Sequence, residues 1–274
     1  MKLINRKPSR PVRVILGILP FLLLLVLYLG ASNARLAENP NDKLLPALST
    51  IGAAIERMAF QPDKRSGDVL LWRDTFSSLG RLAVGVSISA ACALILGVLM
   101  GAIPFARAKL SPLVTAVSLV PPMAILPVLF IVFGLGEVSK IVLIVIGITP
   151  FMTRDLLQRV REIPPEQLIK AQTLGANTWQ IIVRVILPQI LPRLIAAVRL
   201  SLGAAWLFLI AAEAIASTDG LGYRIFLVRR YLAMDVILPY VIWITFLAFV
   251  VDYLLRRVSL FCYPWFHSQA KEND

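Results

Sequence analysis

Residues 82–103 read LAVGVSISAACALILGVLMGAI, a run of 22 amino acids without a charged side chain. A helix of about 20 apolar residues crosses the hydrocarbon core of a bilayer, because each residue adds about 1.5 Å. Pro104 follows the run and is expected to end the helix there. The stretch therefore predicts a membrane-spanning helix and an integral membrane fold.

The composition of the whole chain agrees with this prediction. Of its 274 residues 58% are hydrophobic and 16% charged, and the mean hydropathy is +0.78. Soluble globular proteins carry about 25% charged residues. An ordinary cytosolic enzyme, a secreted disulfide scaffold and a disordered chain are therefore excluded. Cys92, Cys262 and His267 are too few and too scattered to predict a disulfide framework or a metal site.

Five further apolar runs have the character of membrane spans. The run at 113–133 contains Pro121, Pro122 and Pro127, which predicts a bent helix whose freed backbone groups need protein or water partners. With residues 82–103, the sequence predicts an all-α integral membrane fold of six transmembrane helices, the other five being at 14–30, 113–133, 138–152, 194–216 and 236–253.

The first run admits two interpretations. It is either a retained anchor or the core of a cleaved signal peptide, since Ser32, Asn33 and Ala34 loosely imitate a cleavage site. Its length and the later spans favour the anchor. The chain then divides into a tail with the first span (1–30), a polar loop with an amphipathic helix (31–78), a core of five spans (79–255) and a C-terminal tail (256–274).

The basic residues predict which side of the membrane each loop faces. With the N-terminus inside, the inner segments carry sixteen Lys and Arg residues. The 31–78 loop carries six, and the connector before the last span carries Arg224, Arg229 and Arg230. Positive charge concentrates on the cytoplasmic side, so both termini are expected in the cytoplasm. The net charge of +12 thus reflects topology and not a nucleic-acid partner.

The longest polar segment of the C-terminal half, 163–192, is then cytoplasmic as well. Pro165 and Glu166 suit the first turn of a helix, where a missing N–H and a negative charge are both tolerated. Gly175 suits the end of this helix, because glycine accepts a left-handed backbone. The pattern predicts a short helix followed by a tight turn.

A second helix is predicted directly after that turn. Asn177 can cap it, with Gln180 three residues on as in a capping box. Leu187 and Pro188 are expected to end this helix, and Pro192 to open the fifth span. From these residues alone, the segment is either a plug for a cleft on another protein or a structural elbow.

The spacing within this segment resembles a family motif. Ala171, Gly175, Leu187 and Pro188 match the "EAA" loop of binding-protein-dependent ABC importer permeases, with Val185 in its Ile position. Similarity to the nitrate/sulfonate/taurine branch extends over roughly residues 75–255. It includes IPPE at 163–166, TLGA at 173–176, RLSLG at 199–203 and GLGY at 220–223.

The resemblance implies a type I ABC importer permease fold in a bacterial inner membrane. It also implies a second permease copy, with a homodimer preferred, two cytosolic ATPase subunits that bind ATP and Mg²⁺, and a periplasmic or lipid-anchored substrate-binding protein. The chain itself lacks the Gly-x-x-x-x-Gly-Lys-Ser/Thr phosphate loop. We therefore expect a non-catalytic subunit with no cofactor or metal of its own.

On this interpretation the 163–192 loop couples ATP hydrolysis to transport. Two positions differ from the motif, since Ile169 replaces its Glu and Lys170 its first Ala. Glu166 is a candidate to supply the missing carboxylate. The residues assigned to the ATPase contact are Glu166, Lys170, Ala171, Thr173, Leu174, Gly175, Ala176, Leu187 and Pro188.

Glu213 is an acidic residue within the fifth predicted span. Because an ionisable group in a membrane is costly, a role in a gate or in the translocation path is one expectation. An ion pair with Arg224 or Arg229, or simple hydration at the membrane edge, are the others. Further candidates for the path lie in the bent third span, whose freed backbone groups can face water: Ser118, Pro121, Pro122 and Met123.

Two questions of function stay open from the sequence. Arg224, Arg229 and Arg230 are expected either to contact the binding protein or to form a solvated rim. The substrate suggested by the resemblance is a small polar solute such as an alkanesulfonate, taurine or nitrate, with a neutral or cationic nitrogen compound as the alternative.

The competing function is a secondary transporter or channel. Such carriers often contain internal repeats, and none is evident between the two halves of this sequence. A membrane enzyme is disfavoured because no His/Asp/Glu or Cys/His cluster is present.

Overall fold

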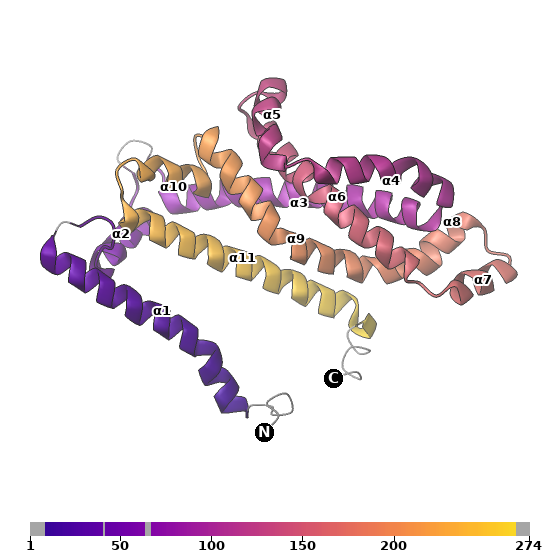
Figure 1. The fold of residues 1–274 in the computed structure, drawn as a ribbon, viewed down its shortest axis with the longest axis horizontal. Coiled ribbons are helices and arrows are strands. Elements are labelled where there is room, and N and C mark those ends of the chain that lie inside the picture. The colour runs from indigo at the N-terminus through magenta and orange to yellow at the C-terminus, as the bar shows by residue number, and fades with distance from the viewer. Residues whose placement is uncertain (1–8, 41, 64–66, 267–274) are drawn as a thin grey trace.

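The computed structural model describes residues 9–40, 42–63 and 67–266, and the regular structure of these residues is entirely helical (Figure 1). In chain order the elements are α1 (Arg10–Glu38), α2 (Leu48–Phe60), α3 (Leu70–Ala102), α4 (Pro104–Leu119), η2 (Pro122–Ile125), α5 (Leu126–Phe133), α6 (Glu137–Arg161), α7 (Pro165–Thr173), α8 (Thr178–Ile181), η3 (Ile182–Ile186), α9 (Leu187–Ile215), α10 (Leu221–Arg229) and α11 (Met234–Cys262).

The lengths of these helices confirm the predicted all-α membrane fold. Within the described residues, five helices are long and apolar enough to cross a bilayer. A sixth crossing is counted when the bent pair Pro104–Leu119 and Pro122–Phe133 is taken as one span. The helix axis bends by 82° between the two parts of this pair, and the break falls at the predicted prolines. Pro121 and Pro122 cannot donate backbone hydrogen bonds, which explains why the helix breaks there.

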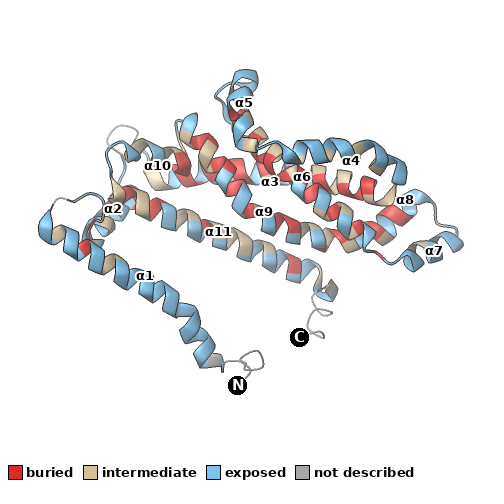
Figure 2. Ribbon diagram, viewed as in Figure 1, coloured by how far each residue is buried: buried red, intermediate tan, exposed pale blue. Residues whose placement is uncertain are grey.

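Three long helices, α3, α6 and α9, form the centre of the bundle, and most buried residues lie on them (Figure 2). Glycines allow the close approach of these helices. A Cβ atom on Gly147 of α6 would overlap the ring of Phe208 on α9. A Cβ atom on Gly101 of α3 would overlap Cβ of Val160 on α6. The core therefore leaves no room for side chains at these two positions.

Gly147→Ala is expected to lower the free energy of unfolding by about 1–3 kcal/mol, because the buried Phe208 ring has to move. Thermal unfolding of the purified chain in detergent measures this loss. Gly203→Ala in α9 is the matched control. Nothing lies within 4 Å of its Cβ position, so stability is expected to stay constant or rise slightly. An equal loss in both variants would contradict the close packing of α6 on α9.

Helix α1 differs from the other spans in having no buried residue in its apolar window. It is held at its C-terminal end, where Tyr28 Oη donates to the Pro46 carbonyl at 2.7 Å and Ser32 Oγ to the Leu45 carbonyl at 2.9 Å. Figure 2 shows α1 exposed along almost its whole length. Its apolar surface is thus left for lipid or for another chain.

Several helices extend beyond the predicted spans, among them α1, which ends at Glu38, and α11, which ends at Cys262. Helix α3 begins at Leu70, twelve residues before the predicted start at residue 82, and its first turns contain Asp74 and Arg81. These charged side chains are tolerated because they are paired inside the protein, as described below. Helix α6 continues to Arg161, past the predicted end at residue 152. There Arg159 pairs with Asp155 and Glu162 along the helix surface.

The predicted helix end at Leu187 and Pro188 is wrong. Helix α8, the π-helical turn η3 and α9 form one continuous apolar helix, Thr178–Ile215, with Pro192 inside it. The chain therefore passes from the 163–192 loop into the membrane without a break.

Candidate functional site

The 163–192 loop lies at one end of the bundle, opposite α10 and α2 (Figure 1). Helix α7 begins after Pro164 with Pro165 in its first turn and Glu166 beside it, as predicted. Leu168 and Ala171 are partly buried against the core. One side of α7 is therefore anchored, while Glu166, Lys170 and Thr173 are exposed.

Gly175 closes α7 in a left-handed conformation, with φ of +82°. The Ala176 N–H bonds the Ala171 carbonyl at 3.0 Å, and the Gly175 N–H bonds the Gln172 carbonyl at 2.9 Å. This pair of bonds is the Schellman arrangement, which satisfies the last carbonyls of a helix. The space around the Gly175 Cβ position is open, so the backbone conformation alone requires glycine here.

The tip of the loop exposes large apolar side chains. Leu174 is 80% exposed, Trp179 70% and Ile169 57%. Exposed apolar groups of this size, gathered at the tip of a projecting segment, are typical of a surface that another protein covers. The tip also includes Ile169, the residue that replaces the motif's Glu.

The second helix of the loop is capped as predicted. Asn177 Oδ1 accepts the Gln180 N–H at 2.9 Å, and Gln180 Oε1 accepts the Asn177 N–H at 2.9 Å. Further along, the side chain of Gln189 donates to Gln167 Oε1 at 3.1 Å and to the Val185 carbonyl at 2.9 Å. The first turn of α9 is thereby tied directly to α7.

Pro188 follows a π-helical turn, Ile182–Ile186, in which the Leu187 N–H bonds the carbonyl of Ile182 five residues back. A proline in a regular α-helix clashes with the carbonyl four residues earlier, and the wider π turn avoids this clash. Leu187 is partly buried and Pro188 exposed. The two motif residues therefore mark the joint between the loop and the membrane helix.

The candidates for the translocation path lie at the bend between α4 and α5. Pro121 and Met123 are exposed and Pro122 is partly exposed. Ser118 Oγ donates to the Thr115 carbonyl at 2.8 Å and accepts from Arg154 Nη1 at 3.2 Å. Glu213 lies in a different part of the bundle, where it contacts Arg81 of α3.

Glu213 is fully buried, and its carboxylate is surrounded by donors from two other elements. Arg81 Nη1 donates to Oε1 at 2.7 Å, Ser78 Oγ to both oxygens at 2.8 and 2.9 Å, and the Gly222 N–H to Oε2 at 2.9 Å. The sequence predicted Arg224 or Arg229 as its ion-pair partner, and the partner is Arg81 of α3. Simple hydration of Glu213 is excluded by its burial.

Arg81 connects this carboxylate to two more. Its Nη2 donates to Glu137 Oε1 at 2.8 Å and also pairs with the Asp219 carboxylate. Lys140 Nζ in turn donates to Glu137 Oε1 at 2.9 Å. Helices α3, α6 and α9 and the 216–220 loop thus meet around one guanidinium that is 5% exposed.

A second buried carboxylate, Asp74, holds α10 and α11. It accepts from Arg224 Nε at 2.8 Å, from Tyr240 Oη at 3.0 Å and from the Gly220 N–H at 3.0 Å. We call the full set the buried polar network: Asp74, Ser78, Arg81, Glu137, Lys140, Glu213, Asp219, Arg224 and Tyr240. It lies at the end of the bundle opposite the 163–192 loop.

Two glycines at the start of α10 allow the backbone to pack closely against this network. Gly220 has φ of +113°, and a Cβ atom there would lie 2.5 Å from Cδ of Glu213. A Cβ atom on Gly222 would lie 2.6 Å from the Ile210 carbonyl oxygen. The GLGY segment therefore has its glycines where the backbone touches the buried carboxylate.

The three arginines of the last connector have different environments. Arg224 is largely buried; burial alone lowers its pKa, but its hydrogen bonds with Asp74 outweigh this and raise the pKa above the ordinary value. Arg229 lies 4.9 Å from the centroid of the Phe226 ring and is exposed, as is Arg230. Arg229 and Arg230 thus remain accessible, while Arg224 is engaged within the chain.

Sequence reasoning missed most of the buried polar network. Asp74, Ser78 and Arg81 are spaced four and three residues apart, which places them on one face of a helix. This spacing is the signal that identifies them once α3 is known to start at Leu70. Glu137, Asp219 and Tyr240 carry no comparable local signal. Within the described part of the chain, no group of three or more His, Cys, Asp or Glu residues is arranged to hold a metal ion.

Comparison with known proteins shows the family to which this helical chain belongs. Residues 93–260 match the family described as the binding-protein-dependent transport system inner membrane component. The chain belongs to this family. It is the membrane permease subunit of an ABC importer, and the competing secondary-transporter interpretation is not supported.

Relatives agree with the assignment. The permease is 35% identical over 198 residues to the taurine transport system permease protein of Escherichia coli K12, covering 72% of each chain. It is 30% identical over 191 residues to a putative aliphatic sulfonates transport permease of Bacillus subtilis 168, covering 70% of this chain and 69% of that one. A bicarbonate transport permease of Synechococcus elongatus is 30% identical over 158 residues, covering 57% and 56%.

The fold is shared with solved ABC transporters. A chain of the MetNI methionine transporter, in an inward-facing conformation, matches with a TM-score of 0.61 at 22% identity, covering 69% of the permease and 94% of that chain. A chain of a bacterial alginate importer matches with a TM-score of 0.59 at 15% identity, covering 90% and 98%. At these identities the likeness concerns the fold alone.

Proposed function

We propose that this permease imports a small oxyanion-bearing solute, with a sulfonate such as taurine or an alkanesulfonate as the first candidate. The support is that relatives of at least 30% identity are named for taurine, aliphatic sulfonates and bicarbonate. These compounds are all small and each bears a negatively charged oxygen group. Nitrate fits the same description.

The 163–192 loop is proposed as the contact with the partner ATPase. The exposed apolar tip of this loop is the observation that supports this proposal. Its apolar tip is exposed in the isolated chain, its end is fixed by Gly175, and its second helix runs continuously into α9. A displacement of the second helix therefore carries directly into α9. Glu166, exposed in the first turn of α7, is the proposed replacement for the motif's carboxylate.

The remaining parts of the assembly follow the same proposal. Two copies of the permease form the pore, with the α4–α5 bend and Ser118, Pro121, Pro122 and Met123 facing it. Two ATPase subunits bind ATP and Mg²⁺, so the permease itself is non-catalytic and needs no cofactor. Both termini and the 163–192 loop face the cytoplasm. Arg229 and Arg230 face the substrate-binding protein.

Transport assays on the reconstituted complex test this proposal. The permease, co-purified with its ATPase and supplied with its binding protein in proteoliposomes, is expected to accumulate labelled taurine or alkanesulfonate only when ATP is enclosed with the ATPase. Uptake driven by an ion gradient without ATP would contradict it. Thermal shift of the binding protein against sulfonates, nitrate, bicarbonate and neutral amines identifies the substrate, and stabilisation by amines alone would overturn the anion assignment.

A further inference from the structure

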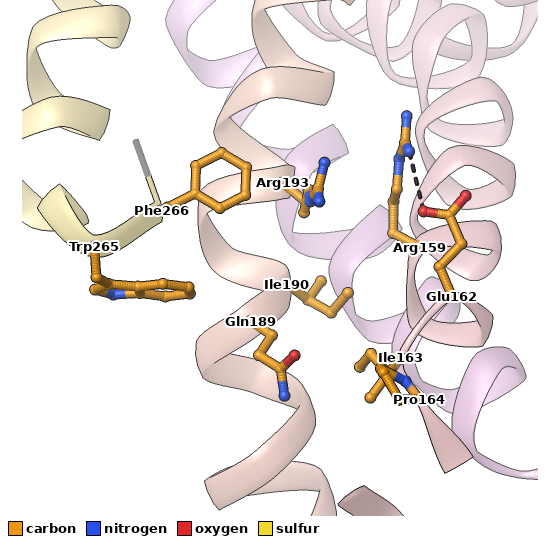
Figure 3. A pocket seen from close by; sticks show the side chains of 9 residues that line it. All are labelled: Arg159, Glu162, Ile163, Pro164, Gln189, Ile190, Arg193, Trp265 and Phe266. Carbon is orange, nitrogen blue, oxygen red and sulfur yellow. Dashed lines mark hydrogen bonds and ion pairs between the residues drawn. The ribbon is translucent and has the colours of Figure 1, made fainter. Parts of the chain in front are cut away.

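A cavity of about 200 Å³ lies beside the root of the 163–192 loop (Figure 3). The end of α6 and the link to α7 form one wall, the first turns of α9 form another, and the segment after α11 closes the third side. Its lining includes Arg159, Glu162, Gln189, Arg193, Trp265 and Phe266. The cavity is separate from the proposed pore residues and from the buried polar network.

The residues that line this cavity include two arginines and one carboxylate, Glu162. Arg159 Nη1 donates to Glu162 Oε2 at 3.1 Å, and its Nε lies 3.5 Å from Asp155 Oδ1. Arg193 forms no ion pair with any described residue, and its guanidinium lies 4.7 Å from the centroid of the Phe266 ring. One positive charge thus faces the cavity without a carboxylate. A planar guanidinium binds phosphate in a two-pronged geometry.

The position of the cavity indicates where such a phosphate comes from. Helices α6 and α11, both long and apolar enough to cross a bilayer, end at Arg161 and Cys262, within a few residues of the lining. Trp265 is 45% exposed beside it, and Phe261 on the last turn of α11 is 88% exposed. Aromatic residues gather at the level of the lipid headgroups, and basic pockets between helix ends bind anionic headgroups.

We propose that this cavity binds the phosphate of an anionic phospholipid, with Arg193 as its ligand. The wall that carries Arg193 also carries Gln189, whose side chain holds Gln167 of α7. A bound headgroup therefore braces the root of the 163–192 loop against the segment after α11. The site does not depend on which substrate the permease carries.

Lipid binding to the purified permease tests this site. Native mass spectrometry in a zwitterionic detergent is used to titrate phosphatidylglycerol against the native chain and Arg193→Gln, and Arg193→Gln is expected to weaken binding at least about tenfold. Arg257→Gln is the matched control. Arg257 also lies over an aromatic ring, 5.1 Å from the centroid of Tyr253, near the same end of α11, but it does not line the cavity. Its variant is expected to bind as the native chain does.

Inorganic phosphate distinguishes a lipid site from a site for a soluble anion. Millimolar phosphate is expected not to displace phosphatidylglycerol from the native chain. Displacement that depends on Arg193 would assign the cavity to a soluble phosphate and overturn the lipid proposal. Equal lipid binding by the native chain and Arg193→Gln would overturn the site itself. Thermal unfolding of both variants in detergent without lipid verifies that neither has lost its fold.

Discussion

Replacing Gly175 with valine is expected to abolish ATP-driven uptake and to release the ATPase from the permease. The residue adopts φ of +82°, a region that costs an L-residue about 1–2 kcal/mol and a β-branched residue more. Valine therefore disrupts the end of α7 and moves the apolar tip formed by Leu174 and its neighbours. Uptake in proteoliposomes and co-purification of the ATPase measure the two effects.

The control for this variant is Gly175→Asn. Asparagine tolerates the left-handed conformation, and no atom lies within 4 Å of the Cβ position, so uptake and assembly are expected to be largely retained. Normal uptake together with normal ATPase association in Gly175→Val would remove the loop from the coupling mechanism. The valine variant should still insert and keep its bundle core folded, since Gly175 is exposed and remote from that core.

Arg81→Met is expected to lower the free energy of unfolding by about 3–5 kcal/mol, more than Gly147→Ala does. It leaves the Glu213 carboxylate fully buried without its cation, and deprives Glu137 and Asp219 of the same partner. Denaturant titration in detergent micelles measures the loss.

Two further variants show whether the cost arises from the buried pair. Arg73→Met, on the same helix, removes a pair with Asp68 whose side chains are 44% and 51% exposed, together with a longer contact of 4.0 Å to Asp219. It should cost no more than about 1 kcal/mol. Combining Arg81→Met with Glu213→Met removes both charges and is expected to recover part of the stability. If Arg73→Met lowered the free energy of unfolding as much as Arg81→Met, the larger cost could not be attributed to the burial of the Arg81–Glu213 pair.

The same double variant separates a structural role of the pair from a role in gating. If Glu213 and Arg81 only hold α3 and α9 together, a double variant with recovered stability also recovers uptake. If the pair opens and closes during transport, uptake stays low although the chain is stable. Glu213→Gln complements this test, because unchanged uptake and unchanged stability in that variant would eliminate both roles.

The apolar runs predicted the class of fold because hydropathy decides which segments enter a bilayer. The ends of the helices were harder to predict. Helix α3 extends back to Leu70 because Asp74, a charge of the predicted loop, and Arg81, just before the predicted span, have buried partners on α10 and α9. Hydropathy is a property of single segments, whereas pairing depends on residues more than 130 positions away.

In the candidate sites, too, local contacts were predictable from the sequence and long-range contacts were not. Gly175, Asn177 and Gln180 were predictable because their hydrogen bonds are made within a few residues of the chain. The partner of Glu213 was not, since Arg81 approaches it only through the packing of α3 along α9. The cavity around Arg193 likewise brings together three separate segments.

The π-helical turn at Ile182–Ile186 has a consequence for movement. It holds one residue more than an α-turn, and each residue corresponds to about 100° of rotation around the axis. If the extra residue shifts along the helix or is absorbed, Asn177 and Trp179 swivel relative to Pro192 while the backbone stays hydrogen-bonded. The helix between the proposed ATPase contact and the membrane can therefore rotate about its own axis without bending.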